Sequence, residues 1–166
     1  MKKQITVSLL LCASAFVLAG CVSPRAYTRV SSTFPQIPVG DGRVFFFWGN
    51  DFIGGGAWEV VELNGDIAGY LSQDSFFYRD KAPGSYIVFE HPKGLFAKAI
   101  GGDQLIFKLD AGETKYIRLK QKLTGMGFIL GGIATGGHPI PVLEDRDSAM
   151  KVLPKCLYYQ GKYHVF

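Results

Sequence analysis

The stretch Arg43-Val44-Phe45-Phe46-Phe47-Trp48 is apolar at five successive positions, and this pattern limits how the rest of the chain can fold around it. Alternate side chains of a strand point to opposite faces, so a strand that is apolar on both faces needs a covering layer on each side. Aromatic and β-branched residues also favour strands. We therefore predict a central strand over residues 43–48 that is covered on both faces.

Strand-like segments bounded by turn residues follow this stretch at roughly ten-residue spacing. Asn64-Gly65 is a strong hairpin signal, because both positions tolerate positive φ. The chain also contains 21 glycines, which punctuate turns, and 14% aromatic residues, which favour strands. The sequence therefore predicts an all-β fold, an antiparallel β-sandwich of about seven strands. The strands expected after residues 43–48 are 57–63, 67–71, 75–79, 85–90, 105–110 and 115–120.

Gly125–Gly137 follows the last of these strands and is rich in glycine and apolar residues. Spaced small residues let helices pack closely in lipid, which suggests a membrane-associated glycine zipper. The run is too short to span a bilayer, however, and each glycine destabilises an exposed helix by about 1 kcal/mol. We favour the alternative, an ordered loop or a strand that extends the sheet.

One short helix is predicted near the C-terminus, over residues 144–153. Acidic residues crowd its start and Lys151 lies near its end, as the helix dipole favours. Its apolar residues would cover one side of the sheet, and residues 157–166 would form a last strand or a docked tail. These apolar residues are Ala149, Met150, Val152 and Leu153.

The N-terminus has the features of a secretory signal, with Lys2 and Lys3 ahead of an apolar run over residues 5–18. The motif that follows, Leu18-Ala19-Gly20-Cys21, resembles the lipobox of bacterial lipoproteins. The resemblance implies that diacylglycerol is attached to the Cys21 sulfur through a thioether and that residues 1–20 are removed. It also implies acylation of the new amino group, and two or more acyl chains give stable anchoring. An uncleaved N-terminal anchor is the alternative.

Val22 follows the lipobox. Among lipoproteins of double-membraned bacteria an Asp at that position commonly marks inner-membrane retention, so the resemblance favours the outer membrane, with the domain facing the periplasm. Residues 21–41 carry three prolines and little periodicity, so we expect a lipid anchor followed by an extended tether. Residues 42–166 would form one β-sandwich domain.

Composition limits the classes of function. Removal of residues 1–20 from the 166-residue chain leaves 146, a length that suits a single domain with its own core. Lys2 and Lys3 leave with the signal, so the formal charge falls from +4 to +2. A nearly balanced chain lacks the basic surface typical of nucleic-acid-binding proteins. Because Cys12 is removed and Cys21 carries lipid, Cys156 has no intramolecular disulfide partner.

Four motifs follow one another in the chain: the aromatic strand Val44–Trp48, the hairpin Leu63–Ile67, and the turn-strand pairs Ala82–Val88 and Ala111–Ile117. Their order and spacing resemble the prealbumin-like and PEGA-like β-sandwich modules of bacterial envelope proteins. More closely, residues 42–121 resemble an uncharacterised lipoprotein domain family, a domain of unknown function, of that sandwich type. The resemblance implies a prealbumin-like fold, and the family brings no catalytic residues.

Candidate catalytic and metal-binding patterns are weak. The histidines His91, His138 and His164 show neither HExxH nor i, i+4 spacing. Cys156 with His164 suggests a thiol or metal site, but a catalytic cysteine needs a base held beside it, and we favour a buried, inert cysteine. The acids within residues 144–147 are expected to be helix-start charges rather than a cation site. We therefore predict no enzyme activity, no metal site and no cofactor.

One patch suggests a binding function. The strand near residues 115–122 would turn Ile117 and Leu119 inward and four other residues outward. Such a basic stripe with an aromatic ring could meet anionic lipid headgroups, cell-wall polymers or an acidic partner. The alternative is a solvated sheet face. The residues of this candidate interaction face are Tyr116, Arg118, Lys120 and Lys122.

The sequence as a whole favours a non-catalytic lipoprotein of the cell envelope, anchored in the outer membrane through Cys21. Its sandwich would bind another envelope protein or help an assembly, and we expect no nucleic-acid partner. The alternative is a carbohydrate- or peptidoglycan-binding module, because aromatic rings can stack on sugars, although strand aromatics usually lie in the core. The aromatic residues concerned are Trp48, Trp58, Tyr78 and Tyr86.

Overall fold

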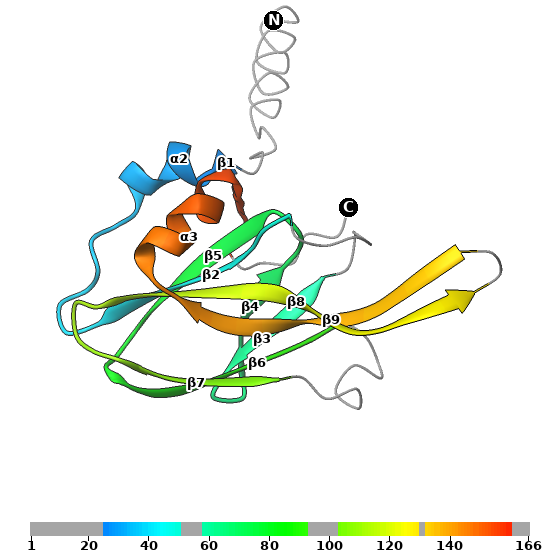
Figure 1. Cartoon of the computed structure of the whole chain (residues 1–166). Coiled ribbons are helices and arrows are strands. Elements are labelled where there is room, and N and C mark those ends of the chain that lie inside the picture. The colour runs from blue at the N-terminus through cyan, green and yellow to red at the C-terminus, as the bar shows by residue number, and fades with distance from the viewer. Residues whose placement is uncertain (1–24, 51–57, 93–102, 130–131, 161–166) are drawn as a thin grey trace, which may run out of the picture.

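The computed structural model describes residues 25–50, 58–92, 103–129 and 132–160, which form two β-sheets with short helices packed on one of them (Figure 1). Sheet A has six strands in the order β1-β10-β5-β2-β8-β9, and sheet B has four in the order β4-β3-β6-β7. The strands are β1 (Arg25–Ala26), β2 (Gly42–Trp48), β3 (Glu59–Leu63), β4 (Asp66–Leu71), β5 (Ser75–Lys81), β6 (Gly84–Pro92), β7 (Gln104–Leu109), β8 (Thr114–Ile129), β9 (Gly132–Glu144) and β10 (Leu157–Tyr158). The helices are α2 (Tyr27–Val30) and α3 (Arg146–Val152), with the 3₁₀ turns η2 (Ser31–Thr33) and η4 (Leu153–Lys155).

All seven strands predicted from the sequence are present, as β2 to β8. At the predicted hairpin between β3 and β4, Asn64 and Gly65 have φ of 54° and 88°, the signs that a type I′ turn requires. The prediction of a purely antiparallel sandwich is wrong for sheet A, because β8 runs parallel to β2 and β10 runs parallel to β5. Parallel pairing needs a long connection, and the chain supplies it by forming β3 to β7 between β2 and β8.

β2 contributes to two separate apolar clusters. Val44, Phe46 and Trp48 lie between the sheets and are at most 2% exposed. Phe45 and Phe47 point to the opposite face of sheet A, where the helices cover them. The predicted central strand with a layer on each face is therefore confirmed. Burial of one such side chain stabilises the fold by roughly 1.5–3 kcal/mol, so β2 anchors both clusters.

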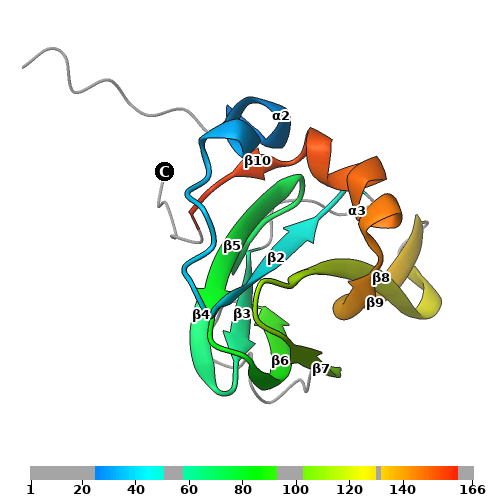
Figure 2. The ribbon, with the colours of Figure 1, turned by 90° about the vertical axis from the view of Figure 1, so that its left-hand side faces the viewer.

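The helices form an outer layer, which we define as α2, η2, α3 and η4 together with the chain that joins η2 to β2. Figure 2 shows α2 and α3 on the same side of sheet A, with sheet B on the other side. The predicted C-terminal helix is confirmed as α3, whose N-cap Asp145 accepts a 2.8 Å hydrogen bond from the Ser148 amide. Ala149 and Leu153 are fully buried against sheet A, so the helix covers the sheet as expected.

The expectation of an extended tether over residues 21–41 is wrong from Arg25 onward. Arg25 pairs with Tyr158 in β1 and β10, and the segment after it packs on sheet A. Tyr27, Val30 and Phe34 recur at helical spacing and supply the apolar side of this segment. Their burial covers aromatic rings of sheet A that would otherwise be exposed to water, which is why the segment folds.

The β8–β9 hairpin extends beyond both sheets (Figure 1). β2 pairs with β8 only as far as Leu119, whereas β8 continues beside β9 to Ile129. We call residues 123–137 of this hairpin the arm. A register shift after Leu123 marks its base, and a Cβ at Gly137 would lie 2.6 Å from the Lys122 carbonyl oxygen, so only glycine fits there. The helical glycine-zipper hypothesis is therefore wrong, and the strand that extends the sheet is confirmed.

Several expectations concern residues outside the described ranges. These are the signal peptide over 1–20, its motif Leu18-Ala19-Gly20, the lipidation site Cys21, and His164. Within the described residues, neither helix has the length and apolar character needed to cross a bilayer.

Candidate functional site

The four residues of the candidate interaction face do alternate along one side of β8, but this side is not an open basic stripe. Tyr116 is 8% exposed, and its ring stacks on Phe45 at 5.6 Å with 7° between the planes. It belongs to the apolar cluster beneath the outer layer. The prediction of an exposed tyrosine is wrong, because α3 folds back over the start of β8.

The three basic members of the face are paired with carboxylates. Arg118 and Lys120 both contact Glu144 of β9, with nitrogen–oxygen distances of 3.4 and 2.7 Å. Lys122 contacts Asp103 at 2.7 Å. Glu144 comes from the neighbouring strand, so the register of β8 with β9 decides this neutralisation. The face therefore sets three cations against two carboxylates, so most of its positive charge is paired and it is not an open basic stripe.

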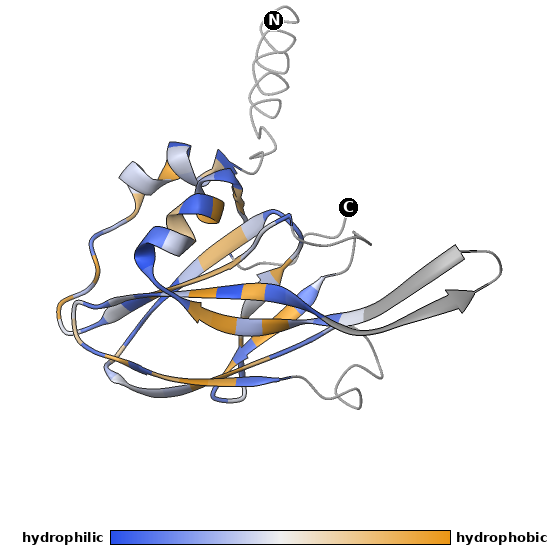
Figure 3. Cartoon of the chain, viewed as in Figure 1, coloured by the Kyte–Doolittle hydropathy of each residue, from blue (hydrophilic) through white to orange (hydrophobic). Residues whose placement is uncertain are grey.

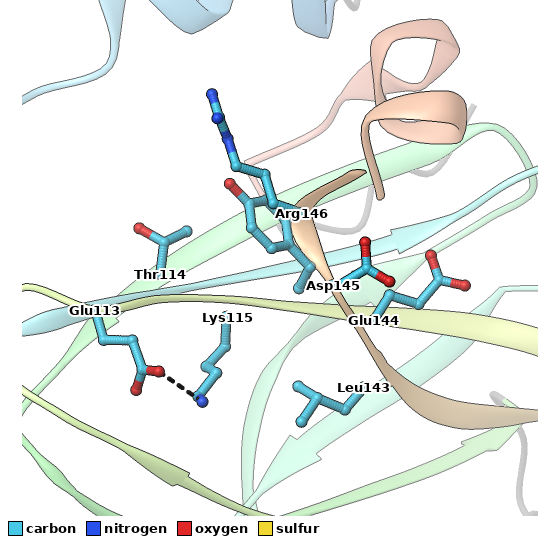
Figure 4. Close-up of a pocket in the computed structure, with 8 residues that line it drawn as sticks. Glu113, Thr114, Lys115, Leu143, Glu144, Asp145 and Arg146 are labelled. Atoms are coloured by element: carbon cyan, nitrogen blue, oxygen red, sulfur yellow. Dashed lines mark ion pairs between the residues drawn. The ribbon is translucent and has the colours of Figure 1, made fainter. Parts of the chain in front are cut away.

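A shallow hollow of about 510 Å³ lies where β8, β9 and α3 meet (Figure 4). The Glu113 and Lys115 side chains on its wall form an ion pair at 2.6 Å. Hydrogen bonding from Lys115 lowers the pKa of Glu113, and the Ser148 backbone amide lowers the pKa of Asp145. Both carboxylates are thus ionised and already engaged, and we assign the hollow no chemistry.

A pair of glutamates points into the core between the sheets. Glu59 of β3 and Glu90 of β6 are 3% and 1% exposed, and they share a hydrogen bond. Burial, followed by the charge of Glu59, raises the pKa of Glu90 to about 9, so Glu90 holds a proton at neutral pH and donates it to the hydrogen bond. Burial also raises the pKa of Glu59 to about 7. In the described structure the Oε2 atom of each has no hydrogen-bond partner.

A second acidic contact lies on the other face of the same two strands. Glu62 of β3 and His91 of β6 approach to 3.2 Å between Oε1 and Nε2, with both side chains at most 10% exposed. Two paired acid–base groups on adjacent strands suggest proton chemistry, but the core pair is closed to solvent. We therefore treat Glu59 and Glu90 as determinants of how stability depends on pH.

Sequence reasoning missed these pairs, although a signal was available. Glu59 and Glu62 stand three residues apart in one strand, and Glu90 and His91 are adjacent. Odd spacing places side chains on opposite faces of a strand, so in each strand one polar group must face the core. The pattern predicts a buried polar group, but which groups meet depends on the β3–β6 register.

The remaining candidates for metal or thiol chemistry are separated in space. Cys156 is fully buried, with Sγ 3.6 Å from the Trp48 carbonyl oxygen, as expected for an inert cysteine. His138 lies 3.7 Å from Asp103, a contact separate from the Glu62–His91 pair. Across the described ranges, His, Cys, Asp and Glu side chains nowhere gather in a group of three or more that could hold a metal ion.

None of the four aromatic residues considered for sugar binding is fully exposed. Trp48 is 2% exposed, and the other three are half-buried. Trp58 packs edge-on against Tyr159 at 5.7 Å, and Tyr86 stacks on Phe107 at the same distance. Tyr78 lies beneath the Arg43 guanidinium at 4.3 Å. These four rings therefore do not offer two open faces side by side to a sugar.

Two surface features of the described chain lie outside the ion pairs and ring contacts described above: the arm, and the basic side chains of the outer layer.

Comparison of the chain with protein-family models, with curated proteins and with solved structures found no significant match in any of the three.

Proposed function

We propose that this protein is a non-catalytic lipoprotein of the cell envelope that acts as a protein-interaction or assembly module. Cys21 carries the lipid that holds it to the outer membrane, facing the periplasm, and the arm is the element that engages the partner. The lipobox Leu18-Ala19-Gly20-Cys21 supports the address. The order and spacing of the motifs over residues 42–121 support a prealbumin-like sandwich of the envelope type.

The observation that carries the proposal is that both outer edges of the arm pair with no other strand of the described residues. β9 is the last strand of sheet A, and β2 no longer accompanies β8 beyond Leu119. Residues 123–137 contain no charged residue. Edge strands present unpaired N–H and C=O groups, and proteins that avoid association protect such edges with charge, proline or a covering segment. A long, uncharged edge is therefore suited to pairing with a strand of another chain.

A protein partner fits the arm better than insertion into lipid. The hydrocarbon core of a bilayer offers no hydrogen-bond partners, so an open strand edge is strongly unfavourable there. A strand from a neighbouring protein would pair with one of these edges and add side-chain contacts. The arm is accordingly assigned to protein contact, and the lipid at Cys21 provides the membrane attachment.

Crosslinking in intact cells tests the proposal, with captured neighbours identified by mass spectrometry. The arm variant Ile129→Lys with Ile133→Lys places charge on both strands of the arm. The control Ile106→Lys places charge on an isoleucine of sheet B that is 69% exposed. We expect wild type and control to capture the same neighbours and the arm variant to lose them, at equal amounts in the membrane fraction. Capture of the same neighbours by the arm variant would contradict the proposal.

A further inference from the structure

We propose that the outer layer lies against the membrane, with its basic side chains on anionic lipid headgroups. This orientation deepens the proposed function and rests on the lipid anchor at Cys21. It follows from the length of the chain between anchor and fold, and from the distribution of charge on the domain.

The folded domain begins close to the anchor. Only Val22, Ser23 and Pro24 separate Cys21 from Arg25, the first residue of β1. An extended chain spans at most about 3.5 Å per residue, so Arg25 lies within about 14 Å of Cys21. The headgroup region of one leaflet occupies about 5–7 Å of that distance. Arg25 therefore stays within about one Debye length, 8 Å at physiological salt, of the lipid surface.

The contacts of β1 determine which side of the domain is held there. Arg25 pairs with Tyr158, and the Tyr27 amide donates a 3.0 Å hydrogen bond to the Cys156 carbonyl oxygen. These bonds fix β1 to β10 and place α2 beside η4. The Arg146 charge at the start of α3 is close enough to Tyr27 to lower its pKa, against the larger effect of burial, which raises it. The side nearest the anchor is thus the outer layer.

The exposed charges at this side are predominantly basic. β1 and the outer layer expose five cations and two acids, and one of the acids, Asp145, is engaged as the N-cap of α3. None of the five cations forms an ion pair with another residue of the described chain. Figure 3 shows hydrophilic residues along the ribbons of β1, α2 and α3. The cations are Arg25, Arg29, Arg146, Lys151 and Lys155.

Among the described residues outside β1 and the outer layer, the fully exposed lysines have carboxylate partners. Lys108 contacts Asp110 at 2.9 Å, Lys115 contacts Glu113 at 2.6 Å, and Lys122 contacts Asp103, as described above. In the part of the chain that the structure describes, the fully exposed cations without a carboxylate partner thus lie at the anchored side. Each Lys or Arg near an anionic leaflet favours binding by about 1 kcal/mol, which is about fivefold in the equilibrium constant. An anionic lipid surface is the occupant favoured by charge and by the short connection to Cys21.

Energy transfer to a labelled bilayer tests this orientation. The lipidated mature protein is placed in vesicles of phosphatidylcholine, with or without phosphatidylglycerol, that contain an acceptor-labelled lipid. A donor is attached at Thr28→Cys on α2 or at Asn64→Cys in the β3–β4 turn, both exposed positions. We expect the Thr28→Cys label to lie nearer the acceptors than the Asn64→Cys label in phosphatidylglycerol vesicles, and this difference to shrink in pure phosphatidylcholine and at high salt.

Charge reversal supplies the matched comparison. Arg29→Glu with Lys151→Glu is expected to shift the orientation equilibrium by at least about 25-fold, the product of two fivefold steps. Lys108→Glu with Lys122→Glu makes the same change in net charge away from the layer and should leave the equilibrium unchanged.

Two results would overturn the proposal and separate it from the anchor. If the protein enters vesicles but both labels are equally far from the acceptors, the proposed orientation alone is wrong. The same holds if the distances do not respond to phosphatidylglycerol or to Arg29→Glu with Lys151→Glu. If the same reversal removes protein crosslinks in cells without moving the labels, the layer binds an acidic protein instead. Protein that does not enter vesicles because Cys21 carries no lipid overturns the anchor and the orientation together.

Discussion

Replacing Glu90 by glutamine should make the fold more stable at neutral and alkaline pH. In wild type, Glu90 lies 1% exposed in the core and its pKa is raised by burial to about 9, from 4.5. Between these two pH values the folded protein holds a proton that the unfolded chain has released. The free energy of unfolding therefore falls as pH rises through this window, by about 1.4 kcal/mol per pH unit at most. The contribution of Glu90 to stability is fully present only below the ordinary pKa of 4.5.

The size of the effect at neutral pH follows from the same two values. The interval from 4.5 to pH 7 corresponds to an upper limit of about 3 kcal/mol, and relaxation of the core reduces this to about 1–3 kcal/mol. Glutamine keeps the shape of the protonated acid and still donates a hydrogen bond to Glu59. Glu90→Gln should therefore match wild type near pH 4.5 and exceed it by this amount at pH 7.

Urea unfolding followed by tryptophan fluorescence measures the difference in the free energy of unfolding, because Trp48 is buried in the apolar cluster between the sheets. The control is Asp66→Asn, which makes the same carboxylate-to-amide change at an exposed position, the first residue of β4. The prediction is wrong if the free energies of unfolding of Glu90→Gln and wild type run parallel from about pH 5 to about pH 8. Parallel curves would show that Glu90 titrates alike in the folded and unfolded states.

Three further changes test the remaining packing. Phe34→Ala should destabilise the domain by about 2 kcal/mol in urea unfolding, because its ring packs on Tyr78 at 4.9 Å. The control Val39→Ala, at a fully exposed site, should have little effect. Equal stability of the two variants would mean that residues 25–38 are only a tether. Arg43→Lys should lower the free energy of unfolding by about 1–2 kcal/mol, because the guanidinium holds both oxygens of Asp80 at 2.6 and 2.8 Å and a lysine holds one; an unchanged unfolding midpoint would contradict this. The Cys156 thiol should resist maleimide in the folded protein and react after unfolding, and rapid labelling of the native state would argue against its burial.

The parts of the fold that the sequence predicts are those decided by local rules. The strand at 105–110 and the hairpin turn at Asn64-Gly65 are predicted from neighbouring residues alone, and both are present as expected. The apolar run at 43–48 also predicts correctly that a layer covers each face of β2. Of the two segments that form the outer layer, the sequence predicts only α3. The segment that begins at Arg25 is predicted as a tether instead.

The missed features depend on contacts between distant segments. The parallel pairing of β2 with β8 joins Arg43 to Thr114, and no local pattern specifies the direction in which the chain re-enters sheet A. The basic stripe on β8 is predicted from one strand alone, but Glu144 of the neighbouring strand forms ion pairs with two of its cations, Arg118 and Lys120. The Glu59–Glu90 pair likewise forms only when β3 and β6 are in register. A charged surface therefore cannot be predicted from the side chains of one strand without those of the strands beside it.

Membrane attachment and the orientation of the outer layer both depend on the lipid proposed for Cys21, which the intact mass of protein extracted from the membrane fraction detects. We predict a chain that begins at Cys21 and carries diacylglycerol on that residue, together with an acyl group on its amino terminus. A mass that includes residues 1–20, or a chain beginning at Cys21 with no added lipid, would contradict it.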